Sequence, residues 1–188
     1  MTRKARRELL YDGCLAHVFS RSVETKHLFN DVQDFYACKG FLLEAKKKYP
    51  FLIHHYCLMR THFHLAVSIP KLTDFSGALQ RFKWAYTTYF NHKYKRRGPL
   101  WQNRFKSLLI ENERYLHACG LYIEANPVQA GLVEDLTQWP YSSSRFYALG
   151  EKDDLLDGYE QPALPDDIAI DKPALFTKGD GIGSKLFK

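Results

Sequence analysis

Long apolar runs, paired cysteines and, over its first part, acidic residues are scarce in this sequence. None of its apolar runs is long enough to cross a bilayer, and its N-terminus has no hydrophobic core of a secretory signal. No two of its four cysteines form a Cys-x-x-Cys pair, which argues against a zinc ribbon and against a secreted disulfide scaffold; they are Cys14, Cys38, Cys57 and Cys119. We therefore expect a soluble, cytoplasmic protein with no membrane partner.

The shortage of acidic residues is confined to residues 1–110, which hold 20 Lys and Arg against 7 Asp and Glu. Residues 111–188 reverse this balance, with 7 against 14, so the net charge of +6 hides two parts of opposite sign. A basic part of this size favours a polyanionic partner, most commonly nucleic acid. The alternative is a solvated basic face with no partner.

The chain has the size and composition of one globular domain. Its 188 residues are 45% hydrophobic and 15% aromatic, which is enough to bury a sizeable core. From about residue 151 the chain becomes more acidic and richer in Pro and Gly. We predict a domain over residues 1–150 and an acidic extension or tail over residues 151–188.

Hydrophobic spacing predicts the order strand, helix, strand, strand, helix, strand, helix. The strands are expected at 14–23, 51–59, 62–70 and 100–110, and the helices at 30–50, 74–94 and 111–126. Asn30 and Asp74 are the expected N-caps of the first two helices. The buried stripe of the second helix is expected to consist of Phe75, Leu79, Phe82, Tyr86 and Tyr89 or Phe90. The third is expected to stop at Asn126, because Pro127 follows it. This order is typical of an α+β, ferredoxin-like (split βαβ) fold, an antiparallel sheet with helices packed on one face.

The stretch "MRTHFHLAV", residues 59–67, carries two histidines in an apolar run. On a strand, His62 and His64 point out of the same face, while Phe63 and Leu65 point the other way. With 8 histidines in the chain, such a triplet arises by chance in roughly a third of similar sequences, so it needs confirming context. A metal held by two imidazoles also needs at least one further ligand.

The last predicted helix offers that ligand together with a candidate nucleophile. Tyr122 and Asn126 are four residues apart and share one helical face, so Asn126 could give an amide oxygen to a metal beside Tyr122. A tyrosine forms a covalent intermediate when a base or a metal activates it, and a metal polarises a phosphate. The alternatives stay open: Tyr122 is one of 12 tyrosines, Asn126 ends a helix, and Tyr115 competes for the same role. His17, on the first strand, is a further neighbour that spacing alone does not place.

Basic residues with interleaved aromatics supply candidates for holding DNA. Tyr94, Trp101 and Phe105 could stack on unpaired bases, although Trp101 and Phe105 would share one side of a strand and could equally face the core. The candidate phosphate-binding residues are Arg3, Lys4, Arg6, Arg7, Lys93, Lys95, Arg96, Arg97, Arg104 and Lys106.

Four blocks in order carry a family resemblance: "HHYCLMRTHFHLAV", "GPLWQNRFKS", "YIEANPVQAGLV" and "WPYSSSRF". Over about residues 10–147 the sequence resembles the REP-associated tyrosine transposase (RAYT) family, single-tyrosine members of the HUH endonuclease superfamily. The resemblance implies a metal-dependent enzyme that cleaves and rejoins single-stranded DNA at hairpin-associated sites. For the oligomeric state we expect a monomer or a homodimer. It implies that His62, His64 and Asn126 bind a divalent metal ion, Mg2+ or Mn2+. Tyr122 would form the 5′-phosphotyrosine intermediate.

The sequence departs from the family pattern next to the proposed site. Arg60 and Thr61 stand where the family commonly has Pro-Asn, and Ser22 and Val23 stand where it commonly has Gly-Asn. These changes remove no proposed ligand, and they bear on loop geometry and on which DNA is recognised. The alternative function is a catalytically silent nucleic-acid-binding domain on the same fold. A metal hydrolase ranks third, because the two strands around the motif contain no Asp or Glu.

Overall fold

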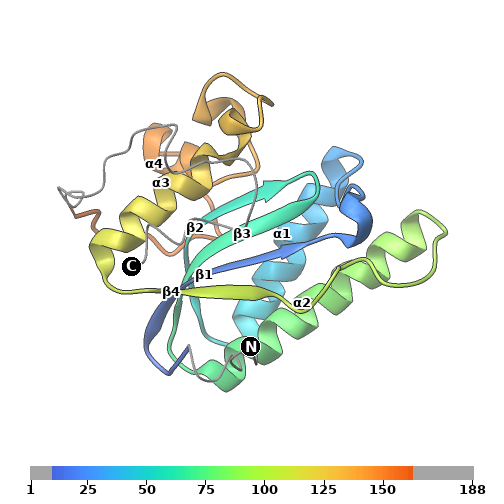
Figure 1. Cartoon of the computed structure of the whole chain (residues 1–188), viewed down its shortest axis with the longest axis horizontal. Helices are drawn as coiled ribbons and strands as arrows, with labels where there is room; N and C mark the ends of the chain where they lie inside the picture. Colours follow the sequence, from blue (N-terminus) through green and yellow to red (C-terminus); the bar gives the residue numbers. More distant parts are fainter. Residues whose placement is uncertain (1–9, 163–188) are drawn as a thin grey trace, which may run out of the picture.

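A four-stranded antiparallel sheet forms the centre of the computed structural model, which describes residues 10–162 (Figure 1). Its strands lie in the order β2-β3-β1-β4, so β3 and β1 are central and each pairs with a strand on both sides. The strands are β1 (Cys14–Arg21), β2 (Leu52–Met59), β3 (His62–Ile69) and β4 (Lys106–Ile110). The α+β, ferredoxin-like prediction is confirmed.

Helices cover both faces of this sheet. The long helices α1 (Val32–Lys48) and α2 (Leu72–Lys93) lie together on one face, and α3 (Glu113–Gln129) crosses the other (Figure 1). On β3, Phe63 packs against Phe82 of α2 at 5.6 Å between ring centroids, whereas His64 faces Tyr122 of α3 at 6.2 Å. The expectation of helices on one face is therefore wrong. The physical reason is that β3 is buried on both faces and needs cover on each.

Three shorter helices complete the described chain. They are η2 (Val23–Thr25), η3 (Leu136–Gln138) and α4 (Ser144–Leu149). None of the helices in residues 10–162 is long and apolar enough to span a membrane.

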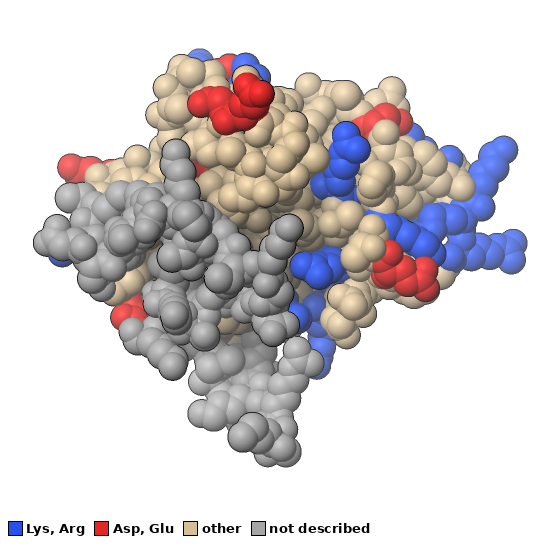
Figure 2. Space-filling view, turned by 45° about the horizontal axis from the view of Figure 1, so that its top comes forward, with Lys and Arg blue, Asp and Glu red and all other residues tan. Residues whose placement is uncertain are grey.

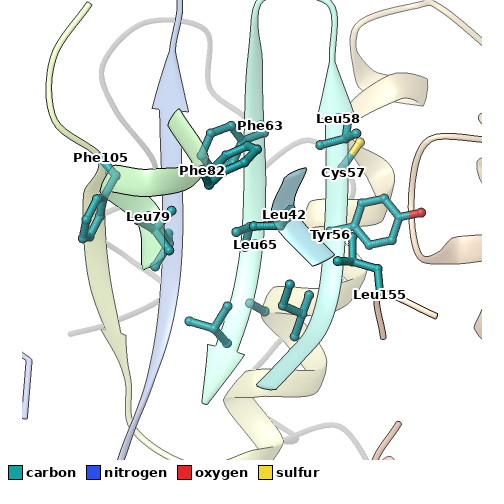
Figure 3. Packing of buried hydrophobic residues seen from close by; sticks show 14 of the residues in the cluster. Leu42, Tyr56, Cys57, Leu58, Phe63, Leu65, Leu79, Phe82, Phe105 and Leu155 are labelled. Atoms are coloured by element: carbon teal, nitrogen blue, oxygen red, sulfur yellow. The ribbon is translucent and has the colours of Figure 1, made fainter. Parts of the chain in front are cut away.

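The largest part of the core lies between the sheet and the two long helices. Leu42 of α1 lies beside Leu65 of β3, and Leu79 and Phe82 of α2 pack under the sheet (Figure 3). The expected apolar stripe of α2 is confirmed: its members are all buried, with Phe90 rather than Tyr89 as the last; they are Phe75, Leu79, Phe82, Tyr86 and Phe90. Helical spacing places these side chains on one face, and their burial fixes α2 to the sheet.

The starts of both long helices differ from expectation. Asp31, not Asn30, is the N-cap of α1, because Asp31 and Asp34 form a reciprocal capping box. The second helix begins at Leu72 after Lys71, so Asp74 lies in its first turn, where a carboxylate favours the helix dipole without capping it.

The expected strand over residues 100–110 is shorter in the structure. Only Lys106–Ile110 pairs as β4, while Trp101 makes an isolated bridge with Ser22. The indole nitrogen of Trp101 donates to the carbonyl of Lys83 at 3.1 Å, and its ring packs edge-on against Phe63. Trp101 therefore packs between α2 and β3 and does not continue strand β4.

The third helix continues past its expected end. Pro127 lies inside α3, which runs to Gln129. A proline has no N–H to donate to the carbonyl four residues earlier, that of Ile123. The side-chain amide of Asn126 donates to this carbonyl at 3.2 Å and to that of Tyr122 at 2.9 Å. The helix survives the proline because a side chain supplies the missing donor.

The start of the expected extension packs on the domain. Asp153 accepts from the hydroxyl of Tyr56 at 2.7 Å and pairs with Lys39 at 2.9 Å, and Leu155 is buried. The backbone N–H of Ile53 donates to Asp157 at 2.9 Å. The boundary at residue 150 stays a prediction, and residues 163–188 of the extension lie outside the described residues.

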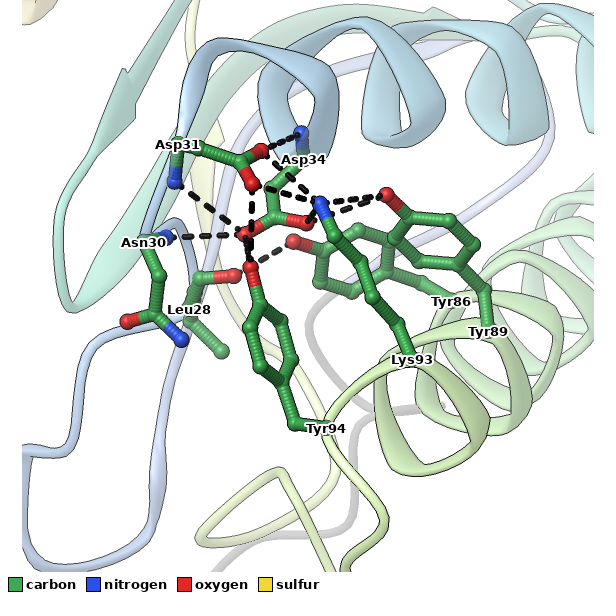
Figure 4. Close-up of polar contacts among 8 residues, drawn as sticks. All are labelled: Leu28, Asn30, Asp31, Asp34, Tyr86, Tyr89, Lys93 and Tyr94. Carbon is green, nitrogen blue, oxygen red and sulfur yellow. Dashed lines mark hydrogen bonds and ion pairs between the residues drawn. The ribbon is translucent and has the colours of Figure 1, made fainter.

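A buried carboxylate joins the two long helices. Asp34 of α1 accepts hydrogen bonds from Lys93 (2.7 Å), Tyr94 (2.7 Å) and Tyr89 (3.0 Å), and from the backbone N–H of Asn30 (2.8 Å) (Figure 4). Burial alone would raise the pKa of Asp34, but these hydrogen bonds, led by that of Lys93, outweigh it and lower the pKa below its usual value. The folded protein therefore stabilises the ionised form of the Asp34 carboxyl group.

Asp34→Asn is expected to lower the free energy of unfolding by about 2–3 kcal/mol at pH 7, the worth of hydrogen bonds to a charged group. Because the folded pKa is depressed, this contribution is fully present above the unfolded pKa, near 4, and is lost as the pH falls through the folded pKa. The two proteins should thus approach equal stability as the pH falls below 4. Urea unfolding followed by circular dichroism between pH 7 and pH 3 measures this, and a constant difference across that range would contradict it.

Candidate metal and nucleophile site

The two histidines of the His-x-His triplet lie on the α3 face of the sheet. In the strand register His64 lies opposite Phe19 of β1, and His62 lies opposite Arg21. His64 is buried and His62 is partly exposed, with 4.9 Å between their ring centroids. The predicted sharing of one face is confirmed by this register.

A third histidine joins them from β1. His17 is fully buried, and its Nε2 lies 2.8 Å from Nδ1 of His64. The two rings are stacked, with centroids 5.1 Å apart. Spacing alone did not place His17; the antiparallel β1–β3 pairing brings it to His64.

All three imidazoles are held in the neutral form. Burial lowers the pKa of His17 to about 3 and that of His62 to about 4, in the latter case with help from the charge of Arg21. Burial also lowers the pKa of His64 well below its usual value, and the neighbouring His17 and His62 add to this. A neutral imidazole has the lone pair that a metal ion requires.

Helix α3 brings Tyr122 over the rings of His17 and His64. The Tyr122 ring lies edge-on to His17 and His64, at 5.9 and 6.2 Å between centroids. Burial raises the pKa of Tyr122, and the nearby Cys119 adds to the effect, so its hydroxyl is protonated at neutral pH. Tyr115, the alternative candidate, lies about two helical turns earlier on α3.

The predicted metal ligands offer two ring nitrogens and one amide oxygen, atom types that suit a divalent cation. Within residues 10–162 no group of three or more His, Cys, Asp and Glu side chains is arranged to hold a metal. Two neutral imidazoles are present, however, and both donations of the Asn126 amide nitrogen go to its own helix, which leaves Oδ1 of Asn126 as the atom for a ligand. A cation bound by this set would keep positions open for substrate oxygen atoms.

A buried polar network fixes α3 to β2. His55 Nδ1 lies 2.8 Å from Glu124 Oε1, and His55 Nε2 lies 2.8 Å from the hydroxyl of Tyr159. Ser143 donates to the same Glu124 oxygen at 2.6 Å. Helix α3 approaches this closely because Gly120 lies directly over the His55 ring. Sequence reasoning missed these residues, although Glu124 stands out as an acidic residue in an otherwise apolar block.

The basic candidates divide into several groups. Lys106 of β4 lies over the ring of Phe19, which stacks on His64, and is thus on the α3 face with the histidines. Arg21, which sequence reasoning missed, is exposed there too, opposite His62. Arg21 lies two residues after Phe19 on a strand, and this spacing could have predicted that both side chains share one face.

The other basic candidates lie farther along the chain. Lys93 is bound to Asp31 and Asp34, at 2.8 and 2.7 Å, so its charge is already paired. Arg96 packs on Phe90 and donates to a backbone carbonyl, while the remaining described candidates are exposed; they are Lys95, Arg97 and Arg104. Basic side chains gather at one end of the face in Figure 2, the end at which Figure 1 shows the C-terminus of α2. The candidates Arg3, Lys4, Arg6 and Arg7 lie outside the described residues.

Residues 10–126 match the family model described as "Transposase IS200 like", more than half of the chain and a span that includes both triplet histidines, Tyr122 and Asn126. The chain belongs to this family of transposases. Among its IS200-like relatives, a putative REP-associated tyrosine transposase of Haemophilus influenzae is 34% identical over 106 residues, 50% of this chain and 60% of the relative. A REP-associated tyrosine transposase of Escherichia coli K12 is 30% identical over 104 residues, 54% of this chain and 59% of the relative. The predicted RAYT resemblance is thus confirmed.

The chain spans about three-fifths of the length of these curated relatives. Its fold also matches the solved structure of a REP-associated tyrosine transposase bound to a REP hairpin, with a TM-score of 0.66. That match covers 90% of this chain and 100% of the other at 22% identity, which shows a shared fold.

Proposed function

We propose that this transposase is a metal-dependent endonuclease and strand transferase that cleaves and rejoins single-stranded DNA at hairpin-associated sites. The observation that carries the proposal is the position of Tyr122 on α3, edge-on to His64 and to its neighbour His17 on the sheet. A potential nucleophile from α3 and a potential metal ligand, His64 of β3, meet there in a partly buried setting. Membership of a transposase family supports the same conclusion.

In the proposed reaction the hydroxyl oxygen of Tyr122 attacks a DNA phosphorus atom. A bond forms from this oxygen to phosphorus while the bond from phosphorus to the 3′ oxygen breaks. The phenol loses its proton, the departing 3′ oxygen gains one, and a 5′-phosphotyrosine and a free 3′-OH result. Attack by a 3′-OH on the phosphotyrosine reverses these bond changes and rejoins a strand.

His62 and His64 would act in this reaction as metal ligands. A divalent cation, Mg2+ or Mn2+, bound by His62, His64 and Oδ1 of Asn126 would polarise the phosphate and stabilise the charge that develops on its oxygens. Arg21 and Lys106 flank the histidines and would bind the phosphates on either side. The hairpin bound by the structural relative supports a hairpin as the partner here.

Adduct formation tests the proposal. The full-length protein is mixed with hairpin oligonucleotides that carry a single-stranded flank and a 3′ fluorophore, in Mg2+, Mn2+ or EDTA, and resolved on a denaturing gel. We expect a covalent adduct with either cation, none in EDTA, and at least a hundredfold less for His64→Ala. His92→Ala, on the exposed side of α2, serves as the matched control and should form adduct normally.

Two outcomes would contradict the proposal. Adduct at full yield in EDTA would exclude the role of the cation. Salt-sensitive DNA binding without adduct under any condition would instead indicate a catalytically silent nucleic-acid-binding domain.

A further inference from the structure

His17 occupies an unusual position for a buried polar side chain. It is fully buried, and the only hydrogen bond of its ring among residues 10–162 runs from Nε2 to Nδ1 of His64. Its other nitrogen, Nδ1, is buried with no partner in that part of the chain. An unpaired buried polar atom costs about 1–3 kcal/mol, so an apolar side chain at this position would serve the fold better.

The bond between the two rings needs one proton and one lone pair. In a neutral imidazole one nitrogen carries the proton and the other the lone pair. When Nδ1 of His64 carries the proton and donates it to Nε2 of His17, Nε2 of His64 keeps its lone pair. In the opposite arrangement Nε2 of His64 is protonated and unable to bind a cation. Metal-binding histidines generally donate their second ring N–H to an acceptor that fixes this tautomer.

We propose that His17 is a positioning residue that accepts the Nδ1 proton of His64 and so directs the Nε2 lone pair of His64 to a divalent cation. The inference rests on the proposed function, because it assigns His17 a part in the same metal site. His17 occupies the place usually taken by a carboxylate or a backbone carbonyl beside a metal-binding histidine. The stacking of the two rings also fixes the orientation of His64.

Two substitutions separate this role from a structural one. His17→Leu fills the space and removes the acceptor together with the unpaired Nδ1. His17→Gln keeps an acceptor, because the side-chain oxygen of Gln reaches about as far from the backbone as Nε2 of His. Both variants are made in the full-length chain, and His54→Gln, a buried histidine of β2 bonded to Ser68, serves as the control.

The first readout is the affinity for Mn2+ in the absence of DNA, measured from the electron paramagnetic resonance signal of free Mn2+. We expect His17→Leu to weaken binding by about 10–100-fold, the usual effect of removing such an acceptor, and His17→Gln to restore most of it. The control should bind as the wild type does. The second readout is the melting temperature without metal, which for His17→Leu should equal or exceed that of the wild type.

The outcomes distinguish this inference from the function on which it rests. Unchanged Mn2+ affinity in His17→Leu, while His62→Ala and His64→Ala abolish binding, would overturn the role of His17 alone. Lower thermal stability with unchanged affinity would assign His17 to the fold. Equal Mn2+ affinity in the wild type, His62→Ala and His64→Ala would overturn the metal site itself and, with it, this inference.

Discussion

Tyr122→Phe is expected to abolish the covalent protein–DNA adduct while leaving the fold and DNA binding intact. The substitution removes one oxygen atom, the proposed nucleophile, and keeps the ring that packs edge-on against His17 and His64. No other atom of Tyr122 can bond to phosphorus, so adduct yield should fall below detection. The melting temperature and the dissociation constant for a hairpin oligonucleotide should change little.

Tyr115→Phe is the matched control for this experiment. It removes the same atom from the same helix, about two turns from the histidines. Adduct should form at normal yield in Tyr115→Phe. The opposite pattern, with adduct lost in Tyr115→Phe and kept in Tyr122→Phe, would move the nucleophile to Tyr115.

Gly120→Ala is expected to destabilise the protein strongly for the addition of a single methyl group. A Cβ at this position would lie 2.3 Å from two atoms of the His55 ring. That ring cannot easily retreat, because it is fully buried, bonded to Glu124 and Tyr159, and stacked on Tyr147 with centroids 4.6 Å apart. Overpacking of this kind costs about 1–3 kcal/mol.

Gly120→Ala should also lower the yield of the covalent protein–DNA adduct. Relieving the clash requires α3 to move away from β2, and α3 carries Tyr122 only two residues later. We expect lower stability in urea unfolding and lower adduct yield at a temperature well below both midpoints. Gly40→Ala in α1 is the control, since a Cβ there meets no atom within 4 Å, and it should stabilise the protein by up to about 1 kcal/mol. Equal responses of the two variants would contradict the close approach of α3 to His55.

Periodicity predicted those parts of the fold that a single element determines. The buried stripe of α2 follows from the helical repeat of 3.6 residues, and the shared face of His62 and His64 follows from the strand repeat of 2 residues. Both repeats can be seen within a single stretch of sequence. The end of α3 did not follow, because the rule for proline considers only the backbone, and here the side chain of Asn126 replaces the missing donor.

Features that depend on contacts between distant segments could not be predicted in this way. His17 reaches His64 only through the β1–β3 register, which aligns Phe19 with His64. Lys93 was expected to bind DNA, and its carboxylate partners lie about sixty residues earlier in the chain. The contact of Lys93 with DNA phosphate stays a prediction.

The network around His55 has a consequence for the order in which the protein forms. It links His55 to Glu124 over a sequence separation of 69 residues and to Tyr159 over 104. Contacts of such separation form late, because the chain must first close long loops. The nucleophile-bearing helix therefore gains this part of its support only after residue 159 has left the ribosome, later than its direct packing on β2 and β3.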